Sequence, residues 1–511
     1  MDAFLSAHAD KITGVLSLFD RILIKGHLPL GYPQGMEKLL LRHGKLFKHL
    51  KSFVLQQSER IKDHARRLAE ESGRPYEYHV GPIAKEKRAR EIAQRDGVHE
   101  GLVCVIATVE PCRSFRLSFG EGRPRILPAR RKCLFLYFYF IDPALGFLHV
   151  RIQTWFPLTI QVYVNEHEWL ARQLDAHGIG YRRLDNAFLS IDDPAAAQGL
   201  ADRFVHLDWM HLLHELARRV NPLLEDLLAG YRYYWAVNQS EYATNLMFTD
   251  RLALKELYPH LLRHATLNLS AEDVLTFLGR KLHHCFAGEI LNDCKKRWPG
   301  ARVKHHMKQN WIKMYDKHAS VLRVETVINN PYEFKVRRTG TRRGQEVVGW
   351  FPLPKGIAHL FRFAEVSLSA NRRYLEALAT VRDPTPAFQE LDRLAKPVRV
   401  RGRALRGFNP IDLEDLNVFR AVLRGEHAIL GFRNRDIRRQ LYSVDHRSES
   451  ERTLGARISR ILKRLHVRNL VAKIPRSHRW RVTRLGHDLM AASLHVRDIH
   501  FVQALTYQAT A

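Results

Sequence analysis

The stretch Val471-Ala-Lys-Ile-Pro-Arg-Ser-His-Arg-Trp-Arg-Val-Thr483 indicates the fold of the C-terminal part of the chain. It predicts a short strand, a basic turn over Pro475–Arg479 and a second strand, because two alternating runs flank a turn that contains proline. Three helices are expected before it, over Asp412–Arg424, Arg433–Leu441 and Arg452–Leu470. The expected order is therefore helix, helix, helix and basic hairpin.

The third of these helices carries apolar residues on one side and cations on much of the rest. The apolar residues fall mostly at steps of three and four, so one side is expected to pack. They are Leu454, Ile458, Ile461, Leu462, Leu465 and Leu470. A cationic helix fits the major groove of DNA, where Arg and Lys reach phosphates and guanine edges. The predicted DNA-binding residues are Arg457, Arg460, Lys463, Arg464, Arg468, Lys473, Arg476, His478, Arg479 and Arg481. The alternative is that these charges only solvate a surface helix.

This order of elements resembles the winged helix-turn-helix superfamily, over roughly a fifth of the chain. The resemblance implies a DNA-binding domain in which the turn at Pro475–Arg479 is the wing, laid against the DNA backbone or the minor groove. It does not indicate a target sequence. Asp383–Arg406, with three prolines and several arginines, is expected to be the linker to this domain.

Charge points to the same class of partner. From Lys396 to Ala511 there are 24 Lys and Arg against 10 Asp and Glu, a net charge of +14 within a total of +29 for the 511-residue chain. The other +15 is spread over the rest, so the body is basic too. Such a field favours polyanions and makes binding strongly salt-dependent. The expected partner is a nucleic acid, with DNA favoured and RNA as an alternative.

Several other classes of function have no support in the sequence. There is no apolar run near the roughly 18 residues that span a bilayer and no signal-peptide pattern, so no membrane partner is expected. Five irregularly spaced cysteines without a CxxC pair are expected to be reduced thiols in a cytoplasmic protein. Motifs for ATP hydrolysis, nicotinamide chemistry and serine hydrolysis are missing. The oligomeric state stays open.

The predicted fold class is α+β, with several domains, mixed or antiparallel sheets, flanking helices and the C-terminal winged helix-turn-helix. The strongest β signal is Lys132–Phe140 and Phe147–Thr154 around a Pro/Gly turn. The expected divisions are an N-terminal α+β domain over 1–195, a helical region over 196–300, a basic β-containing region plus helix over 301–395, and the linker and DNA-binding domain over 396–511.

The most distinctive part of the body is Arg302–Lys317 followed by Val321–Ile328, which we interpret as two strands around a turn. Alternation would place Lys313, Tyr315 and Lys317 on one face. Arg323 and Glu325 would share one face of the partner strand. Burying such a face is costly unless these groups pair or meet a phosphate.

Ile-Lys-Met-Tyr-Asp-Lys followed by Leu-Arg-Val-Glu is similar to a strand pair in replication-initiation factors of phages and rolling-circle plasmids, which nick single-stranded DNA with a tyrosine and a divalent metal. The resemblance implies that Tyr315 faces the scissile phosphate, that Lys317 and Arg323 neutralise it, and that Glu325 binds metal. One departure is the absence of any His-x-His pair, which holds the metal in many such nickases. The alternatives are a structural salt-bridge ladder or a plain nucleic-acid-binding surface.

A second candidate site draws on acidic residues at strand ends, Asp20, Glu110 and Asp142. Two-metal nucleases gather such carboxylates to hold Mg²⁺ or Mn²⁺, and the metal candidates here are Asp20, Glu110 and Glu325. Asp142 precedes a proline and is better explained as a turn former. The aromatic run Tyr231–Trp235 is expected to form helical core, with base stacking as the alternative.

The leading hypothesis is a DNA-binding, DNA-processing factor of a mobile element or replicon, resembling a replication initiator, recombinase or nuclease. A non-enzymatic regulator or architectural protein is the first alternative. The second is an RNA-binding protein that uses the aromatic strand Leu134–Phe140 as a stacking platform.

Overall fold

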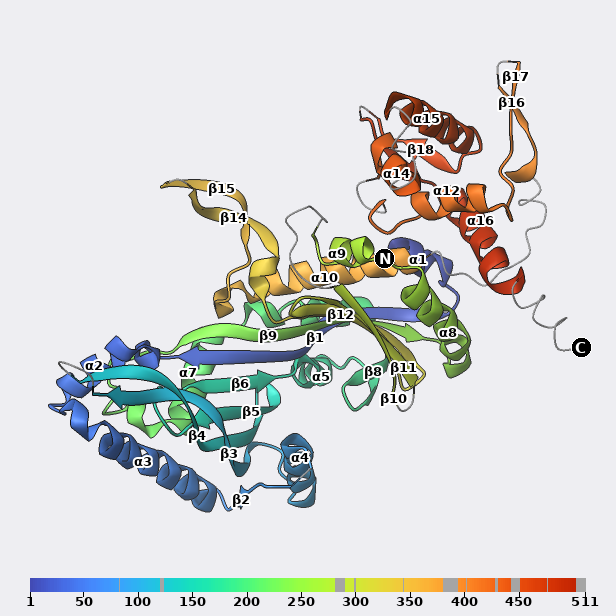
Figure 1. The fold of residues 1–511 in the computed structure, drawn as a ribbon. Coiled ribbons are helices and arrows are strands. Elements are labelled where there is room, and N and C mark those ends of the chain that lie inside the picture. Colours follow the sequence, from blue (N-terminus) through green and yellow to red (C-terminus); the bar gives the residue numbers. More distant parts are fainter. Residues whose placement is uncertain are drawn as a thin grey trace, which may run out of the picture. The chain divides into compact units, whose positions relative to one another are not determined.

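The computed structural model describes residues 1–81, 83–119, 124–280, 290–297, 300–342, 344–379, 394–400, 402–427, 431–442, 451–475 and 477–501. The fold combines long strands with helices (Figure 1). The chain divides into two compact units. Unit 1 comprises Met1–Val15, Asn245–Thr326 and Leu368–Ala511, and unit 2 comprises Leu16–Thr244 and Val327–Ser367. Each unit is thus assembled from segments that are distant in sequence.

Unit 2 holds most of the long strands. Its elements are β1 (Ile12–His27, from Leu16 on), α2 (Pro33–Arg42), α3 (Leu50–Glu71), β2 (Tyr76–Tyr78), α4 (Lys85–Arg95), β3 (Gly101–Ser118), β4 (Arg125–Asp142), β5 (Gly146–Gln153), β6 (Ile160–Val164), α5 (Glu166–Ala176), β7 (Tyr181–Leu184), β8 (Ala187–Ile191), α6 (Pro194–Ala201), α7 (Trp209–Val220), β9 (Tyr234–Phe248, up to Thr244), β14 (Lys335–Arg342) and β15 (Gln345–Pro352).

Unit 1 contains shorter strands and the C-terminal helices. Its elements are α1 (Asp2–Ala7), α8 (Arg251–Leu267), α9 (Ala271–Phe277), β10 (Ile290–Arg297), β11 (Gly300–Met307), β12 (Asn310–Lys317), β13 (Val321–Ile328, up to Thr326), α10 (Leu360–Leu378, from Leu368), β16 (Val398–Val400), β17 (Arg403–Leu405), α12 (Leu413–Val422), α14 (Asn434–Leu441), α15 (Glu451–Val467), β18 (Val471–Lys473), β19 (Trp480–Val482) and α16 (Arg484–His495).

Eleven of the strands form one mixed sheet, in the order β10-β11-β12-β13-β9-β1-β6-β5-β4-β3-β2. Within unit 2, β1 pairs antiparallel with β6, β6 with β5, β5 with β4 and β4 with β3, whereas β2 runs parallel to β3. The α+β class and the mixed sheet with flanking helices therefore agree with the prediction. In β1, Ile22 and Ile24 point to the buried side, and Arg21, Leu23 and Lys25 lie on the more open face.

The aromatic hairpin predicted at Lys132–Phe140 and Phe147–Thr154 corresponds to β4 and β5, whose register pairs Tyr137 with Arg151. Asp142 closes the turn between them, because its Oδ1 accepts hydrogen bonds from the backbone N of Ala144 and of Leu145, each at 3.0 Å. Asp142 is thus a turn former, as one of the two interpretations held.

The prediction that residues 196–300 are helical is wrong in two places. β9 and β10 are strands, and the aromatic Tyr231–Trp235 leads into β9. Every residue from Ser240 to Phe248 is buried, so this strand shows no alternation of polar and apolar side chains. Because β9 is buried on both faces and also contains Asn and Glu, its sequence does not alternate between polar and apolar residues. Hydrophobic periodicity therefore could not identify it as a strand.

The two-strand interpretation of Arg302–Ile328 also needs correction. Residues 302–317 form parts of two strands, β11 and β12, with a turn at Lys308 and Gln309. Lys308 adopts a left-handed conformation with φ of 54°, which sequence patterns signal only when Gly, Asn or Asp occupies the turn. The four consecutive domains that we predicted do not coincide with the two units, because each unit collects segments from different parts of the chain.

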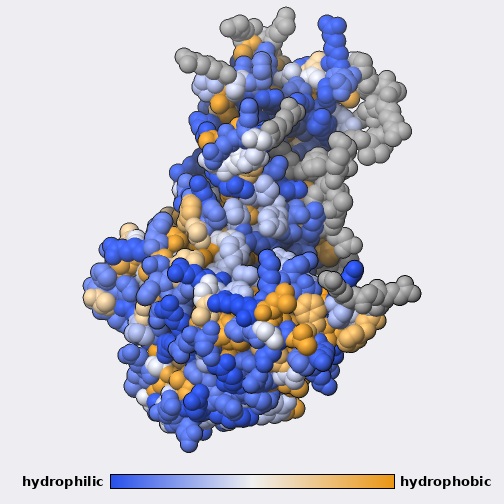
Figure 2. Space-filling model, turned by 90° about the vertical axis from the view of Figure 1, so that its left-hand side faces the viewer, coloured by the Kyte–Doolittle hydropathy of each residue, from blue (hydrophilic) through white to orange (hydrophobic). Residues whose placement is uncertain are grey.

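The face in Figure 2 is mainly hydrophilic, and its hydrophobic residues form separate patches. Within the described ranges, no helix combines the length and the apolar character that a membrane crossing demands.

Glu166, at the first position of α5, provides a test of the interior of unit 2. Its carboxyl group is buried, and Oε2 accepts a hydrogen bond from the backbone N of Phe19 at 2.6 Å. Burial raises the pKa of Glu166 well above its usual value. A raised pKa in the folded state means that stability is lost as pH rises from the unfolded-state pKa through the folded-state pKa.

We therefore expect Glu166→Gln to raise the melting temperature, by an amount that grows between about pH 5 and pH 8. Differential scanning fluorimetry across this range measures the effect. Glu225→Gln, which changes an exposed acid, is the matched control and should show no such trend. Parallel pH profiles of the wild type and Glu166→Gln would show that the idea is wrong.

Candidate nucleic-acid interface

The helices α12, α14, α15 and α16 and the hairpin β18–β19 share one apolar core, which we call the C-terminal module. Leu416 and Phe419 of α12, Ile437 of α14, and Ile458 and Leu462 of α15 are buried in it. α12 begins at an N-cap, Asp412, whose side chain accepts a hydrogen bond from the backbone N of Asp415. The observed elements follow the predicted order of three helices and a hairpin, within a few residues at each end.

α15 presents its cations away from this core. Leu454, Ile458, Leu462 and Leu465 are buried at steps of three and four residues. Arg457, Arg460 and Lys463 are exposed on the remaining surface of the same helix. The core therefore fixes α15 and leaves three of its cations on the surface.

The hairpin adds a second group of cations. Its register pairs Val471 with Val482, Ala472 with Arg481 and Lys473 with Trp480. The backbone of Phe432 pairs with that of Trp480 in β19: Phe432 N donates to the Trp480 carbonyl at 2.9 Å, and Trp480 N donates to the Phe432 carbonyl at 2.8 Å. The side chains of Lys473, His478 and Arg481 are exposed, and Arg476 lies outside the described residues.

Three predicted DNA-binding residues donate hydrogen bonds to backbone carbonyls that are distant in sequence. Arg464 donates to the carbonyls of Arg406 (3.2 Å) and Gly407 (2.5 Å) and lies 3.3 Å from a carboxylate oxygen of Asp415. Arg468 donates to the carbonyls of Lys396 and Leu405 at 3.0 and 3.2 Å. Arg479 donates to the carbonyl of Gly431 at 3.0 Å.

Burial lowers the pKa of both Arg464 and Arg468 from the usual value. We conclude that Arg464 and Arg468 hold the segment before α12 against α15. The sequence pattern could not separate them from the exposed cations of the same helix. Two exposed residues of α14, Arg435 and Arg439, were missing from the predicted set, although that helix was expected to be basic.

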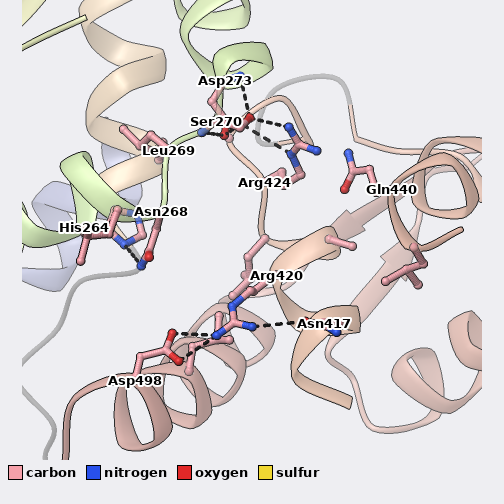
Figure 3. A pocket seen from close by; sticks show the side chains of 17 residues that line it. His264, Asn268, Leu269, Ser270, Asp273, Asn417, Arg420, Arg424, Gln440 and Asp498 are labelled. Carbon is pink, nitrogen blue, oxygen red and sulfur yellow. Dashed lines mark hydrogen bonds and ion pairs between the residues drawn. The ribbon is translucent and has the colours of Figure 1, made fainter. Parts of the chain in front are cut away.

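A cavity of about 510 Å³ within unit 1 lies between α8, α9 and the C-terminal module. Figure 3 shows Arg420 directed toward Asp498 and Arg424 toward Ser270 and Asp273. Arg420 is 2.7 Å from Asp498, and Arg424 donates to Ser270 Oγ at 2.5 Å. Both guanidinium groups of this cavity therefore have partners within unit 1.

Within unit 1, β12 and β13 carry the buried ionic cluster that the alternation predicted. The Tyr315 hydroxyl donates to Glu325 Oε2 at 2.7 Å, and Lys313 Nζ lies 2.8 Å from Glu325 Oε1. Arg323 is fully buried, and its Nε donates to Asn245 Oδ1 at 2.6 Å. The guanidinium carbon of Arg323 lies 5.9 Å from the centre of the Tyr315 ring. Buried charge is therefore stabilised by paired partners.

Lys317 lies at the end of β12, where its carbonyl accepts a hydrogen bond from the backbone N of Ser320 at 3.2 Å. Of the four residues predicted to be catalytic, Tyr315 and Glu325 are in direct contact, and Arg323 lies over the Tyr315 ring. Lys313 was named only for its strand face, yet its Nζ pairs with Glu325 at 2.8 Å.

Two of the predicted metal ligands, Asp20 and Glu110, belong to unit 2. In unit 2, Asp20 Oδ1 accepts a hydrogen bond from Asn186 Nδ2 at 2.7 Å, and the carboxylate oxygens of Asp20 and Glu241 lie within 4.8 Å. These two residues could provide ligands for Mg²⁺ or Mn²⁺. Glu241, on β9, was missed because β9 was expected to be helical. Glu325 belongs to unit 1, where Tyr315 and Lys313 engage its carboxylate.

The carboxylate of Glu110 contacts a tyrosine and two cations of unit 2. It accepts a hydrogen bond from the Tyr137 hydroxyl at 2.7 Å and pairs with Arg151 and with Lys85. Burial alone would raise the pKa of Glu110, but Tyr137 and the two cations outweigh burial and lower it. Glu110 therefore serves as the counter-ion of Arg151.

Comparisons of the chain with protein-family models, with curated proteins and with solved structures found no match.

The structure predicts that two neighbouring arginines of α15 have different effects on stability. Arg464→Ala removes donors from two carbonyls and leaves Asp415, 7% exposed, without this partner. We expect a loss of about 1–3 kcal/mol in the free energy of unfolding, measured by urea denaturation with circular dichroism. The control is Arg460→Ala, at an exposed position, which should change stability by less than about 0.5 kcal/mol. Equal losses for the two variants would contradict the anchoring role of Arg464.

Proposed function

We propose that this chain is a DNA-binding protein that contacts duplex DNA through the C-terminal module. The observation that carries the proposal is the placement of Arg457, Arg460 and Lys463 on the exposed side of a helix whose other side is fixed in a core. An α-helix fits the major groove of B-DNA, and its cations can reach phosphates and base edges.

The hairpin supports the same proposal. Lys473, His478 and Arg481 are exposed on the two-stranded hairpin β18–β19. Exposed cations on such a hairpin are suited to contact the DNA backbone or the minor groove. A winged helix-turn-helix is the fold that we assign to these elements. The net charge of +29 adds long-range attraction for any polyanion.

DNA is favoured over structured RNA on geometric grounds. The major groove of an RNA helix is too narrow and deep for a helix such as α15. The RNA alternative relied on β4 as a stacking platform, but Phe135, Tyr139 and Phe140 are no more than 3% exposed, so bases cannot reach these rings.

The double substitution Arg457→Ala with Arg460→Ala tests this proposal. Each phosphate contact contributes about 0.9 to the slope of log K against log salt concentration, so the loss of two contacts should lower the slope by about 1.8. Fluorescence anisotropy with a labelled random-sequence duplex, at several salt concentrations, measures both affinity and slope.

The matched control is Lys87→Ala with Arg203→Ala, which removes two exposed cations of unit 2. It should leave the slope unchanged. Single- and double-stranded RNA of the same sequence are measured at the same salt concentrations. An unchanged slope for the Arg457/Arg460 variant, or tighter binding to RNA, would rule out the proposed interface.

The buried cluster in unit 1 favours a second candidate function, a DNA-processing factor of a mobile element or replicon. The Tyr315 hydroxyl donates to the Glu325 carboxylate at 2.7 Å. This carboxylate could accept the phenolic proton when the tyrosine oxygen attacks a phosphodiester of DNA; a phosphotyrosine bond would form, one phosphorus–oxygen bond of the strand would break, and the released sugar oxygen would leave as a hydroxyl after taking up a proton. Lys313 Nζ lies 2.8 Å from the other oxygen of this carboxylate. Without this activity, the chain would be a regulator or an architectural protein.

This candidate predicts nicking of labelled single-stranded DNA with Mg²⁺ or Mn²⁺, with label retained on the protein. Tyr315→Phe and Glu325→Gln should each abolish nicking while the melting temperature shows that the protein is folded. Tyr78→Phe, at an exposed tyrosine of β2, is the control. Absence of nicking with either metal, or nicking that survives both substitutions, leaves the binding function alone.

A further inference from the structure

We propose that unit 2 binds single-stranded nucleic acid at a surface formed by Lys25, His27, Lys355, Tyr234 and Tyr332, which we call the cation–tyrosine surface. It would take phosphates on the three basic side chains and unpaired bases on the two rings. The surface shares no residue with the C-terminal module, so this inference extends the proposed function and can be tested independently of it.

Lys25 lies in a row of polar side chains on one face of the sheet. Lys25 of β1 pairs in register with Gln161 of β6, which pairs with Arg151 of β5. Residues directly opposite each other on antiparallel strands point to the same face, so these three side chains form one row. Arg151 donates to Gln161 Oε1 at 3.1 Å and has Glu110 as its counter-ion.

Lys25 differs from Arg151 because, in the part of the chain that the structure describes, it has no carboxylate partner. The same holds for His27, two residues further along the same face, and for Lys355. Arg113 lies next to this group, since its carbonyl accepts a hydrogen bond from Gln153, which is two residues beyond Arg151 on β5. The cations therefore gather without the acids that neutralise charge elsewhere in unit 2.

Like-charge crowding affects the protonation of these groups. Burial, followed by the charges of Arg113 and Arg151, lowers the pKa of Lys25. Burial, followed by the charges of Lys25, Lys355 and Arg113, lowers the pKa of His27. A phosphate bound here would relieve this repulsion, because an opposite charge stabilises the protonated forms.

The two tyrosines flank Lys355. Its Nζ lies 5.3 Å from the ring centre of Tyr332, which is 58% exposed. Tyr234 is 61% exposed, and its hydroxyl oxygen lies 3.2 Å from the position that a Cβ on Gly356 would occupy. The backbone carbonyl of Lys355 accepts a hydrogen bond from the N of Val237 at 2.8 Å, which holds this segment against β9.

The hairpin β14–β15 extends the surface, since Tyr332 precedes its first strand and Lys355 follows its second (Figure 1). Arg337 pairs in register with Trp350, which is 66% exposed. An exposed ring beside an exposed cation matches the combination of stacking and charge that binds unpaired strands.

The exposed rings of Tyr234 and Tyr332 favour a single-stranded nucleic acid over a duplex as the ligand. Exposed aromatic side chains stack on bases only where the bases are unpaired, whereas the bases of a duplex are already stacked on one another. An anionic membrane could also meet cations and exposed rings, and it is an outcome of the test below.

The test uses the full-length protein and a labelled oligothymidylate. For single strands each phosphate contact contributes about 0.7 to the salt slope, so Lys25→Gln with Lys355→Gln should lower the slope by about 1.4. The control, Lys87→Gln with Arg203→Gln, removes the same charge from exposed positions of unit 2 and should have no such effect.

Base stacking is tested separately. Tyr234→Ala and Tyr332→Ala should each weaken binding of oligothymidylate at least about 5-fold and leave binding of an abasic oligonucleotide of equal length unchanged. The corresponding Tyr→Phe variants should keep the wild-type affinity, because stacking needs the ring and not the hydroxyl. Tyr78→Ala, at an exposed tyrosine of β2, is the control.

The outcomes separate this inference from the proposed function. The Arg457/Arg460 double variant should lose duplex binding and keep most of its binding to oligothymidylate. Loss of oligothymidylate binding in that variant alone would place both activities in the C-terminal module and overturn the inference. So would equal effects of the tyrosine substitutions on abasic and normal strands. Preferential binding to vesicles containing phosphatidylglycerol would replace the nucleic acid with a membrane. Melting temperatures close to that of the wild type show that each variant is folded.

Discussion

The cost of removing positive charge from water determines where the 82 lysines and arginines of this protein can lie. Arg323 is fully buried with Asn245 as a hydrogen-bond partner, and Arg464 is held by two carbonyls and Asp415. The 53 acidic residues are too few to neutralise all of these cations. The remainder must stay at the surface, and their positions there are the basis of both proposed interfaces.

The C-terminal module was the most predictable part of the fold. Its helices have apolar residues at steps of three and four, and the hairpin has a proline-containing turn between alternating strands, so local sequence determines each element. Alternation also predicted that Lys313 and Tyr315 share a face, and both contact Glu325. The strands of the pairs β12–β13 and β18–β19 are joined by short turns, so neighbours in these sheets are also close in the sequence.

The sequence could not reveal the central part of the sheet. β9 is buried along Ser240–Phe248 and contains Asn and Glu, so neither its period nor its composition marks a strand. Glu241 and its neighbour Asp20 are more than 200 positions apart, and so are Lys25 and Lys355. Contacts between residues so distant in sequence follow from tertiary pairing, which composition and local periodicity do not encode.

The return of the chain to unit 1 after Thr244 has a consequence for synthesis on the ribosome. Thr13 Oγ1 donates to the carbonyl of Met247 at 3.2 Å, and the carbonyl of Lys11 accepts a hydrogen bond from the N of Thr249 at 2.9 Å. At roughly 5–20 residues per second, these partners emerge about 10–50 s after the N-terminal segment. During that interval the start of β1 has unpaired backbone groups, a state in which strands aggregate. Residues 1–15 therefore belong to a unit whose other segments are synthesised more than 200 residues later, and a ribosome-associated chaperone could cover them in that interval.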